Sequence, residues 1–282
     1  MELARFDPQK GEFLPYLPGI SADQLSFSSD GKWVVYVSFP EGSLWRAKVD
    51  GTDRAQLTFP PMRVIVPRWS PDGKRIAFMA AGSDNIWKIY VVPVEGGAAR
   101  LLLPGSGQEA DPNWSADGQW LVFGPVCCPK GSETELLHTL DMRTNHVSMV
   151  PGSRGLYSPR WSPDGRYLAA LRAITYELML FDFISKKWTQ LTDFAAAYPN
   201  WSHDGRYIYF QDKTKGIDAP PRLVRISIPG RKLETLVDMA RGMHVSARAD
   251  VIPWSGLAPD DSPLVVRDIS TEEIYALDWQ EQ

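Results

Sequence analysis

The chain has 282 residues, of which 44% are hydrophobic, enough to bury a substantial core as one large or two small domains. The 30 Lys and Arg against 34 Asp and Glu give a net charge of −4, which lacks the basic excess typical of nucleic-acid-binding proteins. The most apolar stretch, residues 167–183, contains Arg172 and Glu177, which excludes a membrane-spanning helix in this segment. The opening residues 1–8 also lack the basic and apolar regions of a secretion signal.

A short repeat runs through the whole chain. Its core is an aromatic residue followed by Ser, a variable residue, Asp and Gly, and the copies are Phe27–Gly31, Trp69–Gly73, Trp114–Gly118, Trp161–Gly165 and Trp201–Gly205, with a degenerate sixth at Leu257–Asp261. The successive aspartates are 42, 45, 47, 40 and 56 residues apart. This spacing accounts for all 282 residues, so we expect a single repeat domain over residues 1–282.

Each repeat core precedes runs rich in residues that favour strands. The first runs are residues 33–38, 75–79, 120–123, 167–171, 207–211 and 264–267; the second are 44–49, 86–94, 136–142, 178–183, 223–228 and 274–279; the third are 55–59, 100–103, 147–150, 188–191 and 233–237. With the strand that ends at the repeat's aromatic residue, each unit has four strands in about 45 residues, as in a propeller blade. We therefore predict an all-β fold, a six-bladed β-propeller of four-stranded antiparallel blades.

The repeat core itself predicts a tight turn between the first two strands of each blade. Proline presets φ, aspartate accepts backbone N–H groups two residues on, and glycine takes the left-handed conformation. We interpret the aspartates as turn formers, not catalytic acids. The aromatic residues Trp69, Trp114, Trp161 and Trp201 are expected to pack between neighbouring blades.

The N-terminal residues are expected to close the ring. The last repeat supplies three strands, and residues 12–17 are predicted to be a fourth strand that pairs with residues 274–279. Residues 3–6 also have the pattern of a third strand, so they compete with residues 274–279 for one place. A closed ring hides its strand edges, which favours a monomer.

At these repeats the sequence resembles the TolB-like six-bladed β-propellers built from WD-like PD repeats. The resemblance implies one of several roles: a periplasmic interaction protein, the gating propeller of a prolyl oligopeptidase-like peptidase, a sugar lyase, or the C-terminal half of a bacterial winged-helix regulator. The stretch from Gly256 to Trp279 looks most like the last group, so we expect part of a larger bacterial protein. The resemblance also favours a periplasmic or other extracytoplasmic location.

Catalytic and metal-binding patterns are sparse in this sequence. The only cysteines, Cys127 and Cys128, are adjacent, which excludes a framework of disulfides. Lyases that the fold resembles hold a metal with several histidines, but of the four histidines here only His244 falls where a channel mouth is expected. There is no Gly-x-Ser-x-Gly elbow and no phosphate-binding glycine loop. We expect no catalytic residues, no resident metal and no cofactor.

The channel is where the blades differ most. Strand alternation places residues three and one positions before each repeat's first residue on one side, namely Gln24 and Ser26, Val66 and Arg68, Asp111 and Asn113, Ser158 and Arg160, Tyr198 and Asn200, and Trp254 and Gly256. Arginine and tyrosine are favoured anchors of recognition sites. The predicted binding residues of this channel face are Arg63, Arg68, Glu109, Asp111, Asn113, Arg154, Tyr157, Arg160, Tyr198, Asn200, Arg241 and His244.

Three hypotheses about function remain open. The first is a non-enzymatic recognition module that binds a protein or a small ligand on the channel face. The alternative is a lyase or hydrolase that acts on a carbohydrate or lactone through Asp111, Glu109 or His244. The third is a purely structural scaffold whose channel holds only water, although a bound cation or small anion is a further possibility.

Overall fold

The structure is a computed structural model that describes residues 1–105, 107–126, 135–216, 220–239, 253–267 and 269. These residues form strands and turns, without a helix. The strands are β1 (Glu2–Asp7), β2 (Glu12–Pro15), β3 (Ala22–Phe27), β4 (Trp33–Ser38), β5 (Leu44–Lys48), β6 (Ala55–Gln56), β7 (Arg63–Trp69), β8 (Arg75–Ala81), β9 (Lys88–Pro93), β10 (Arg100–Leu101), β11 (Ala110–Trp114), β12 (Trp120–Gly124), β13 (His138–Asp141), β14 (Val147–Met149), β15 (Leu156–Trp161), β16 (Tyr167–Arg172), β17 (Glu177–Asp182), β18 (Lys187–Trp201), β19 (Tyr207–Asp212), β20 (Arg222–Ser227), β21 (Leu233–Asp238), β22 (Ser255–Leu257) and β23 (Pro263–Arg267).

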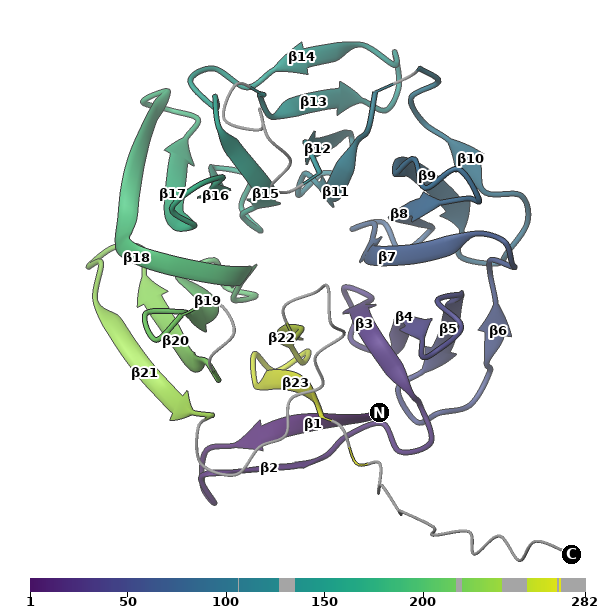
Figure 1. Cartoon of the computed structure of the whole chain (residues 1–282), viewed down its shortest axis with the longest axis horizontal. Coiled ribbons are helices and arrows are strands. Elements are labelled where there is room, and N and C mark those ends of the chain that lie inside the picture. Colours follow the sequence, from purple (N-terminus) through teal and green to yellow (C-terminus); the bar gives the residue numbers. More distant parts are fainter. Residues whose placement is uncertain (106, 127–134, 217–219, 240–252, 268, 270–282) are drawn as a thin grey trace, which may run out of the picture.

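The strands form six blades around one axis. Four antiparallel sheets have four strands each, and a fifth sheet has seven. The seven-stranded sheet divides at β18, because the first half of this strand pairs with β17 and its second half pairs with β19. Figure 1 shows β3, β7, β11, β15, the end of β18 and β22 nearest to the axis. The predicted six-bladed, all-β architecture with four-stranded antiparallel blades is confirmed.

The repeat core folds as the sequence predicted, and its serine has a role that the prediction did not assign. In the second blade Ser70 Oγ donates to Asp72 Oδ1 at 2.5 Å and accepts the Arg75 N–H at 2.9 Å, while Asp72 Oδ1 accepts the Lys74 N–H at 3.0 Å. Gly73 has a φ of +70°, which glycine adopts without steric cost. The serine-to-aspartate bond and the aspartate-to-backbone bond recur in all five clean copies. The serine thus ties the start of the second strand to the turn.

The aromatic residues of the repeat pack between blades. Trp114 is 6% exposed and packs with Ala77, Ile89 and Val91 of the preceding blade. Its indole Nε1–H donates to the backbone carbonyl of Arg68 at 3.1 Å, and Trp201 makes the equivalent bond to Arg160 at 2.9 Å. Each of these tryptophans therefore joins its blade to the preceding blade through apolar contacts and through the hydrogen bond of its indole N–H.

The last blade combines the two ends of the chain, in an arrangement that corrects one prediction. β1 pairs with β23, from Glu2 opposite Arg267 to Arg5 opposite Leu264, and β2 pairs with β1. β1 therefore takes the third place in this blade, for which residues 3–6 and 274–279 were both candidates, and residues 12–15 pair with β1, where pairing with residues 274–279 was predicted. A short hairpin connects β1 to β2, so this pairing is local, and Leu3 and Ala4 are buried. Residues 274–279 lie outside the described residues.

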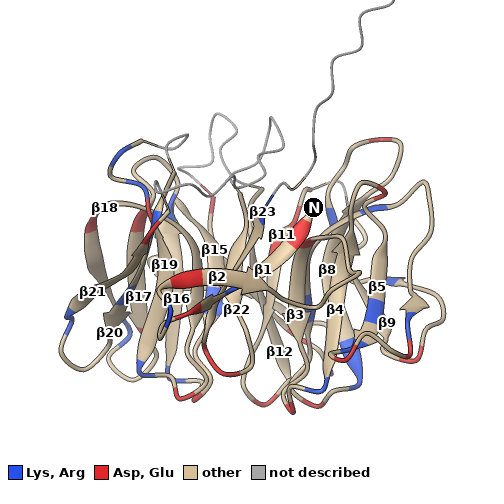
Figure 2. Cartoon of the chain, turned by 90° about the horizontal axis from the view of Figure 1, so that it is seen from below, with Lys and Arg blue, Asp and Glu red and all other residues tan. Residues whose placement is uncertain are grey.

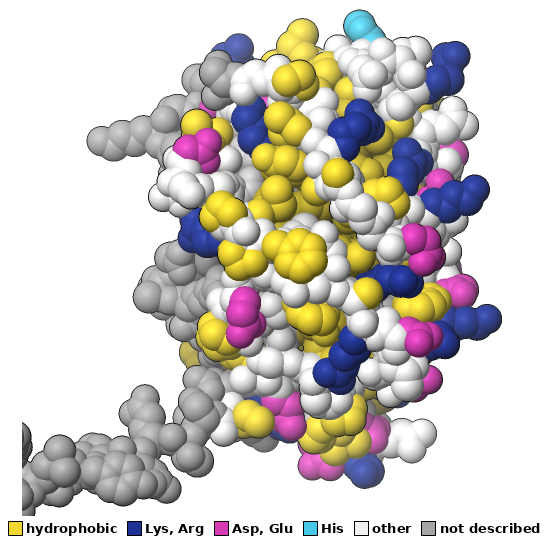
Figure 3. Space-filling model, turned by 90° about the vertical axis from the view of Figure 1, so that its right-hand side faces the viewer, with side chains coloured by type: hydrophobic (Ala, Val, Ile, Leu, Met, Phe, Trp, Pro, Cys, Tyr) yellow, Lys and Arg dark blue, Asp and Glu magenta, His cyan; other side chains and the backbone are white. Residues whose placement is uncertain are grey.

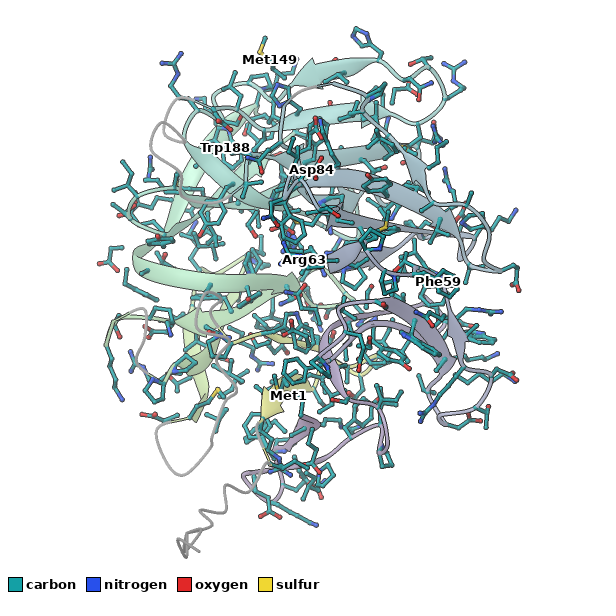
Figure 4. All side chains as sticks on the ribbon, turned by 45° about the vertical axis from the view of Figure 1, so that its right-hand side comes forward. Met1, Phe59, Arg63, Asp84, Met149 and Trp188 are labelled. Atoms are coloured by element: carbon teal, nitrogen blue, oxygen red, sulfur yellow. The ribbon has the colours of Figure 1, made fainter. Side chains whose placement is uncertain are left out.

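Charged residues lie both in the turns and on the strands. Figure 2 shows acidic and basic residues in the turns at both ends of the blades, and others on strands such as β1, β2 and β5. On the outer side shown in Figure 3, hydrophobic side chains reach the surface between charged ones. In Figure 4, Phe59 and Met149 lie at the periphery, and they are 62% and 64% exposed. The hydrophobic core lies between the blades. Near the outer edges of the blades, some large hydrophobic side chains are exposed to solvent.

Candidate functional site in the channel

One cavity lies at the end of the channel next to the repeat turns. Its volume is about 240 Å³, and the exposed turn residues Ser29 and His203 form part of its wall, so it opens on the face that carries these turns. Its lining includes all six residues that immediately precede the repeat cores, which are Ser26, Arg68, Asn113, Arg160, Asn200 and Gly256. The cavity is therefore built from the same position of every blade.

Two arginines and one aspartate from three neighbouring blades form the charged centre of this site. Arg160 Nη1 lies 2.7 Å from Asp111 Oδ1, and Arg68 Nη2 lies 3.9 Å from the same oxygen. The exposed fractions of these side chains are 6% for Arg160, 15% for Arg68 and 17% for Asp111. Asp111 thus joins two guanidinium groups that would otherwise repel each other in a poorly hydrated place.

A β-bulge in the innermost strand explains how Asp111 reaches both arginines. The register of β11 against β12 shifts between Ala110 and Asn113, and Asp111 has a φ of +56°. The equivalent residues of β7, β15 and β18 have the same left-handed conformation, and each precedes a buried proline; they are Val66, Ser158 and Tyr198. Proline has no backbone N–H, and it fits here because the innermost strand is an edge strand with no neighbouring strand on its channel side to receive such a hydrogen bond. Bulges of this kind re-aim a side chain that regular alternation would place elsewhere.

The electrostatics of the three charges are strongly coupled. Burial by itself would raise the pKa of Asp111, but the guanidinium groups of Arg160 and Arg68 outweigh it and hold the pKa of this carboxyl below its ordinary value. Burial and then the charge of Arg160 lower the pKa of Arg68 to about 9. Asp111 and Arg68 are therefore charged at neutral pH, and two guanidinium groups around one carboxylate leave one positive charge in excess.

Tyr157 and Tyr198 belong to the same environment. Burial raises the pKa of both phenols, and the Asp111 carboxylate raises each of them further. The Asp23 carboxylate also raises the pKa of Tyr198. Both tyrosines therefore stay protonated. Asp23 was missed by the sequence analysis because it is the extra residue of the bulge in β3, where the register against β4 shifts between Ala22 and Gln24.

Asn113 and Asn200 contribute to the wall of the cavity, but part of their hydrogen-bonding capacity holds the blades together. Asn113 Oδ1 accepts the backbone N–H of Trp161 in the next blade at 2.8 Å. Asn200 Nδ2 donates to the Tyr198 carbonyl at 2.8 Å and, over 3.4 Å, to the carbonyl of Ser255 in the next blade. Gln24 and Ser26 accept equivalent bonds from the backbone of β7. These polar groups are already satisfied, so they offer less to a ligand than the arginines do.

The structure places Arg63, Glu109 and Arg154 away from this cavity, at the opposite ends of the innermost strands from the repeat turns. Arg63 lies over the ring of Trp87, with its guanidinium carbon 5.6 Å from the ring centroid, and Figure 4 shows it nearer to the axis than Phe59. Glu109 pairs with Lys88 at 3.1 Å, and Arg154 is exposed. The predicted binding residues are therefore not brought together as one set.

The two remaining predicted residues, Arg241 and His244, lie outside the described residues. Within the described part of the chain, no three His, Cys, Asp or Glu side chains are grouped so that they could hold a metal ion. No helix in that part is long and apolar enough to cross a membrane.

Two of the three tryptophans in the cavity wall were not predicted to be part of it. Trp161 and Trp201 were expected only to pack between blades, but they also line the cavity, together with Trp254. Trp254 lies against Gly256, where an added Cβ would come within 2.4 Å of the indole ring. The absence of a side chain at position 256 therefore makes room for the indole of Trp254.

Comparisons with known proteins agree with this architecture. An uncharacterized protein of Agrobacterium fabrum is 28% identical over 113 residues, 36% of this chain and 39% of that protein. Dipeptidyl-peptidase 5 of Porphyromonas gingivalis is 40% identical over 65 residues, 20% of this chain and 10% of that protein. The matches thus span well under half the length of either relative.

Two solved structures share the fold. A TolB-like protein from Agrobacterium tumefaciens superimposes with a TM-score of 0.75 at 18% identity, covering 96% of this chain and 98% of that one. An oligogalacturonate lyase in complex with manganese gives a TM-score of 0.59 at 14% identity, covering 98% and 87%. At such identities the likeness shows the fold alone.

These comparisons give no support to the expected likeness to winged-helix regulators. The family model that matches the sequence is the TolB beta propeller domain, PD40, over residues 24–249. This range contains all five clean repeat cores, while β1, β2, β22 and β23 of the closing blade lie outside it. The chain belongs to the PD40 family of TolB-type β-propellers.

Proposed function

We propose that this propeller is a non-enzymatic recognition module, the sensor or scaffold part of a larger bacterial protein, which binds a partner segment or small ligand in the cavity beside the repeat turns. The observation that carries the proposal is the charged centre of Arg68, Asp111 and Arg160, which is built from three blades and whose two arginines line an open cavity. Buried arginines beside aromatic walls are characteristic of recognition sites.

The same geometry gives less support to the alternative, a lyase or hydrolase. Arg160 and Arg68 lower the pKa of Asp111, which makes its carboxylate a weak proton acceptor at neutral pH. Burial raises the pKa of Glu109, but this residue pairs with Lys88 at the other end of the innermost strands. An acid–base pair needs two groups that reach the same substrate.

The test is a peptide-display selection on the purified protein, followed by titration of the selected peptides against three proteins. These are the wild type, Arg160→Lys, which keeps the charge but removes the planar fork, and Arg166→Lys as a matched control outside the cavity. We expect Arg160→Lys to weaken binding by about tenfold or more, because a bidentate arginine contact is not replaced by lysine. The control should bind as the wild type does.

Equal affinity of the wild type and Arg160→Lys for every selected peptide would reject this cavity as the binding site. A parallel screen with glycans, lactones and esters tests the alternative. Turnover that disappears in Asp111→Asn or His244→Ala would replace the recognition function with an enzymatic one.

A further inference from the structure

The cavity wall carries positive charge without a carboxylate. Among the described residues that line the cavity, the titratable groups are the two arginines and His203. His203 Nδ1 lies 2.7 Å from Asp261 Oδ1. Asp111 pairs with both arginines from deeper in the channel but neutralises only one of them. The cavity therefore lies beside one uncompensated positive charge.

Each arginine also has a buried hydrogen-bond donor to spare. Within the described residues, the Nε atoms of Arg68 and Arg160 are buried and have no hydrogen-bond partner. A buried donor without an acceptor costs about 1–3 kcal/mol, and more when it is charged. An acceptor in the cavity would recover part of this cost only where a guanidinium group turns its Nε–H toward it, and an anion would do so best.

The rest of the wall combines polar residues, among them Ser26, Asn113 and Asn200, with an apolar part. Trp161, Trp201 and Trp254 contribute aromatic surface, and Leu25 and Leu257 add aliphatic surface. The volume of about 240 Å³ is below the range of about 300–1,000 Å³ that is typical of pockets for whole cofactors or drug-sized ligands. The cavity is therefore suited to a small molecule or to the end of a longer chain.

We propose that this cavity binds a monocarboxylate with an apolar body, whose carboxylate pairs with Arg160 and Arg68 while its apolar part lies against the tryptophans. The proposal rests on the recognition function above and names the chemistry that would be recognised. Two sources share this chemistry: the terminal carboxylate of a peptide with apolar last residues, and a free organic acid.

The charge balance distinguishes this ligand from two others. A cation, the other channel ligand expected from the sequence, would meet two guanidinium groups and no free carboxylate in the wall. A phosphate dianion would bring two negative charges to a site with one uncompensated positive charge. Asp23 is left out of this count, because its charge raises the pKa of Tyr198 and is not among the charges that shift the pKa of Arg68.

The experiment compares matched probes by isothermal titration or ligand-observed NMR. The probes are 3-phenylpropionate, its neutral amide and phenyl phosphate, together with the peptide Ala-Ala-Leu-Phe carrying either a free or an amidated C-terminus. We expect each free acid to bind about tenfold or more tightly than its amide, because only the acid forms charge-assisted bonds. Tighter binding of the peptide acid than of 3-phenylpropionate would assign the site to a chain terminus, and the reverse order to a free acid.

The variants make the outcome specific to the cavity. Arg160→Lys should weaken the binding of the acids by about tenfold and leave the binding of the amides unchanged. Arg166→Lys should change the binding of neither. Arg68→Lys provides a second test if thermal melting shows that Arg160→Lys does not fold. Equal binding of acids and amides, or tighter binding of phenyl phosphate, would overturn the carboxylate proposal. The recognition function would still stand if the binding of display-selected peptides required Arg160. Failure of the carboxylate proposal can therefore be distinguished from failure of the recognition function.

Discussion

At the scale of single residues, the serine of the repeat is the least replaceable part of the turn. Ser70 is fully buried, and its hydroxyl serves as donor to Asp72 and as acceptor for the Arg75 N–H. The sequence showed that the serine recurs, but it could not show which atoms it joins. The roles of aspartate and glycine in the turn were predictable because both are local. The aspartate accepts a backbone N–H two residues on, and the glycine adopts a positive φ.

We predict that Ser70→Ala lowers the free energy of unfolding by about 1–3 kcal/mol, because it leaves the Arg75 N–H without an acceptor and removes a donor to Asp72. Thermal melting measures the change. Ser29→Ala is the matched control, since the Ser29 hydroxyl is exposed and makes one bond of 3.3 Å to the Pro71 carbonyl. Equal melting temperatures for the two variants would contradict this role.

A second residue-scale prediction concerns Asp111. Asp111→Asn should destabilise the fold by about 3–5 kcal/mol, because it leaves two buried guanidinium groups without their shared counter-ion. Addition of sodium benzoate should restore part of the lost stability, since a bound anion would supply beside the arginines the negative charge that the variant lacks. Denaturant titration with and without benzoate checks both effects. A variant as stable as the wild type would show that Asp111 does not hold the arginines together.

At the scale of elements, the repeated turns make the propeller sensitive to acid. The backbone N–H of Arg206, with the Ser202 hydroxyl and the Arg206 side chain, lowers the pKa of Asp204 from 3.8 to about 2. Hydrogen bonds lower the pKa values of Asp30 and Asp117 in the same way. A carboxyl whose pKa is lower in the folded state stabilises the fold above its unfolded value and loses this contribution as the pH falls.

We therefore expect the melting temperature to fall as the pH is lowered from about 4 to about 2. Asp204→Asn should be less stable than the wild type at neutral pH and should show a shallower decrease over this interval. Melting curves at a series of pH values measure both. A decrease of the same steepness in the variant would contradict the contribution of Asp204.

The bulges show why strand alternation was insufficient to predict the site. The residue before each repeat core was expected to face the channel, and all six of these residues line one cavity. The residue two positions earlier is the bulged one in four blades, and Val66, Ser158 and Tyr198 are not typical of a left-handed conformation. The residue types themselves do not indicate this conformation, but the proline that follows each of them is a signal for a bulge, which simple strand alternation leaves out.

At the scale of the whole molecule, the two chain ends meet in one blade. Arg267 pairs with Glu2 at 2.5 Å, and Arg5 pairs with Asp260 at 3.1 Å. The rings of Phe6 and Phe13 are 5.2 Å apart and join β1 to β2. The sequence predicted that the N-terminal residues complete the last blade, but two segments had the same pattern. Strand propensity does not tell which of two similar strands pairs, because the contacts between chain ends are non-local.

Deletion of residues 1–18 should lower the melting temperature greatly, because it exposes Leu264 and Val265 and removes Leu3, Phe6 and Phe13 from the core. Each buried side chain of this size contributes about 1.5–3 kcal/mol. Glu2→Gln, which weakens only the ion pair with Arg267, is the milder comparison and should have a small effect. An unchanged melting curve after the deletion would show that these strands do not hold the ring.

The central claim is that the buried arginines are the binding groups of this propeller, and NMR of their side chains tests it most directly. The Nε–H resonances of Arg68 and Arg160 should shift when 3-phenylpropionate or a display-selected peptide is added, while that of the exposed Arg166 should not. Unchanged resonances of both buried arginines at a saturating concentration of a bound ligand would place recognition elsewhere on the molecule.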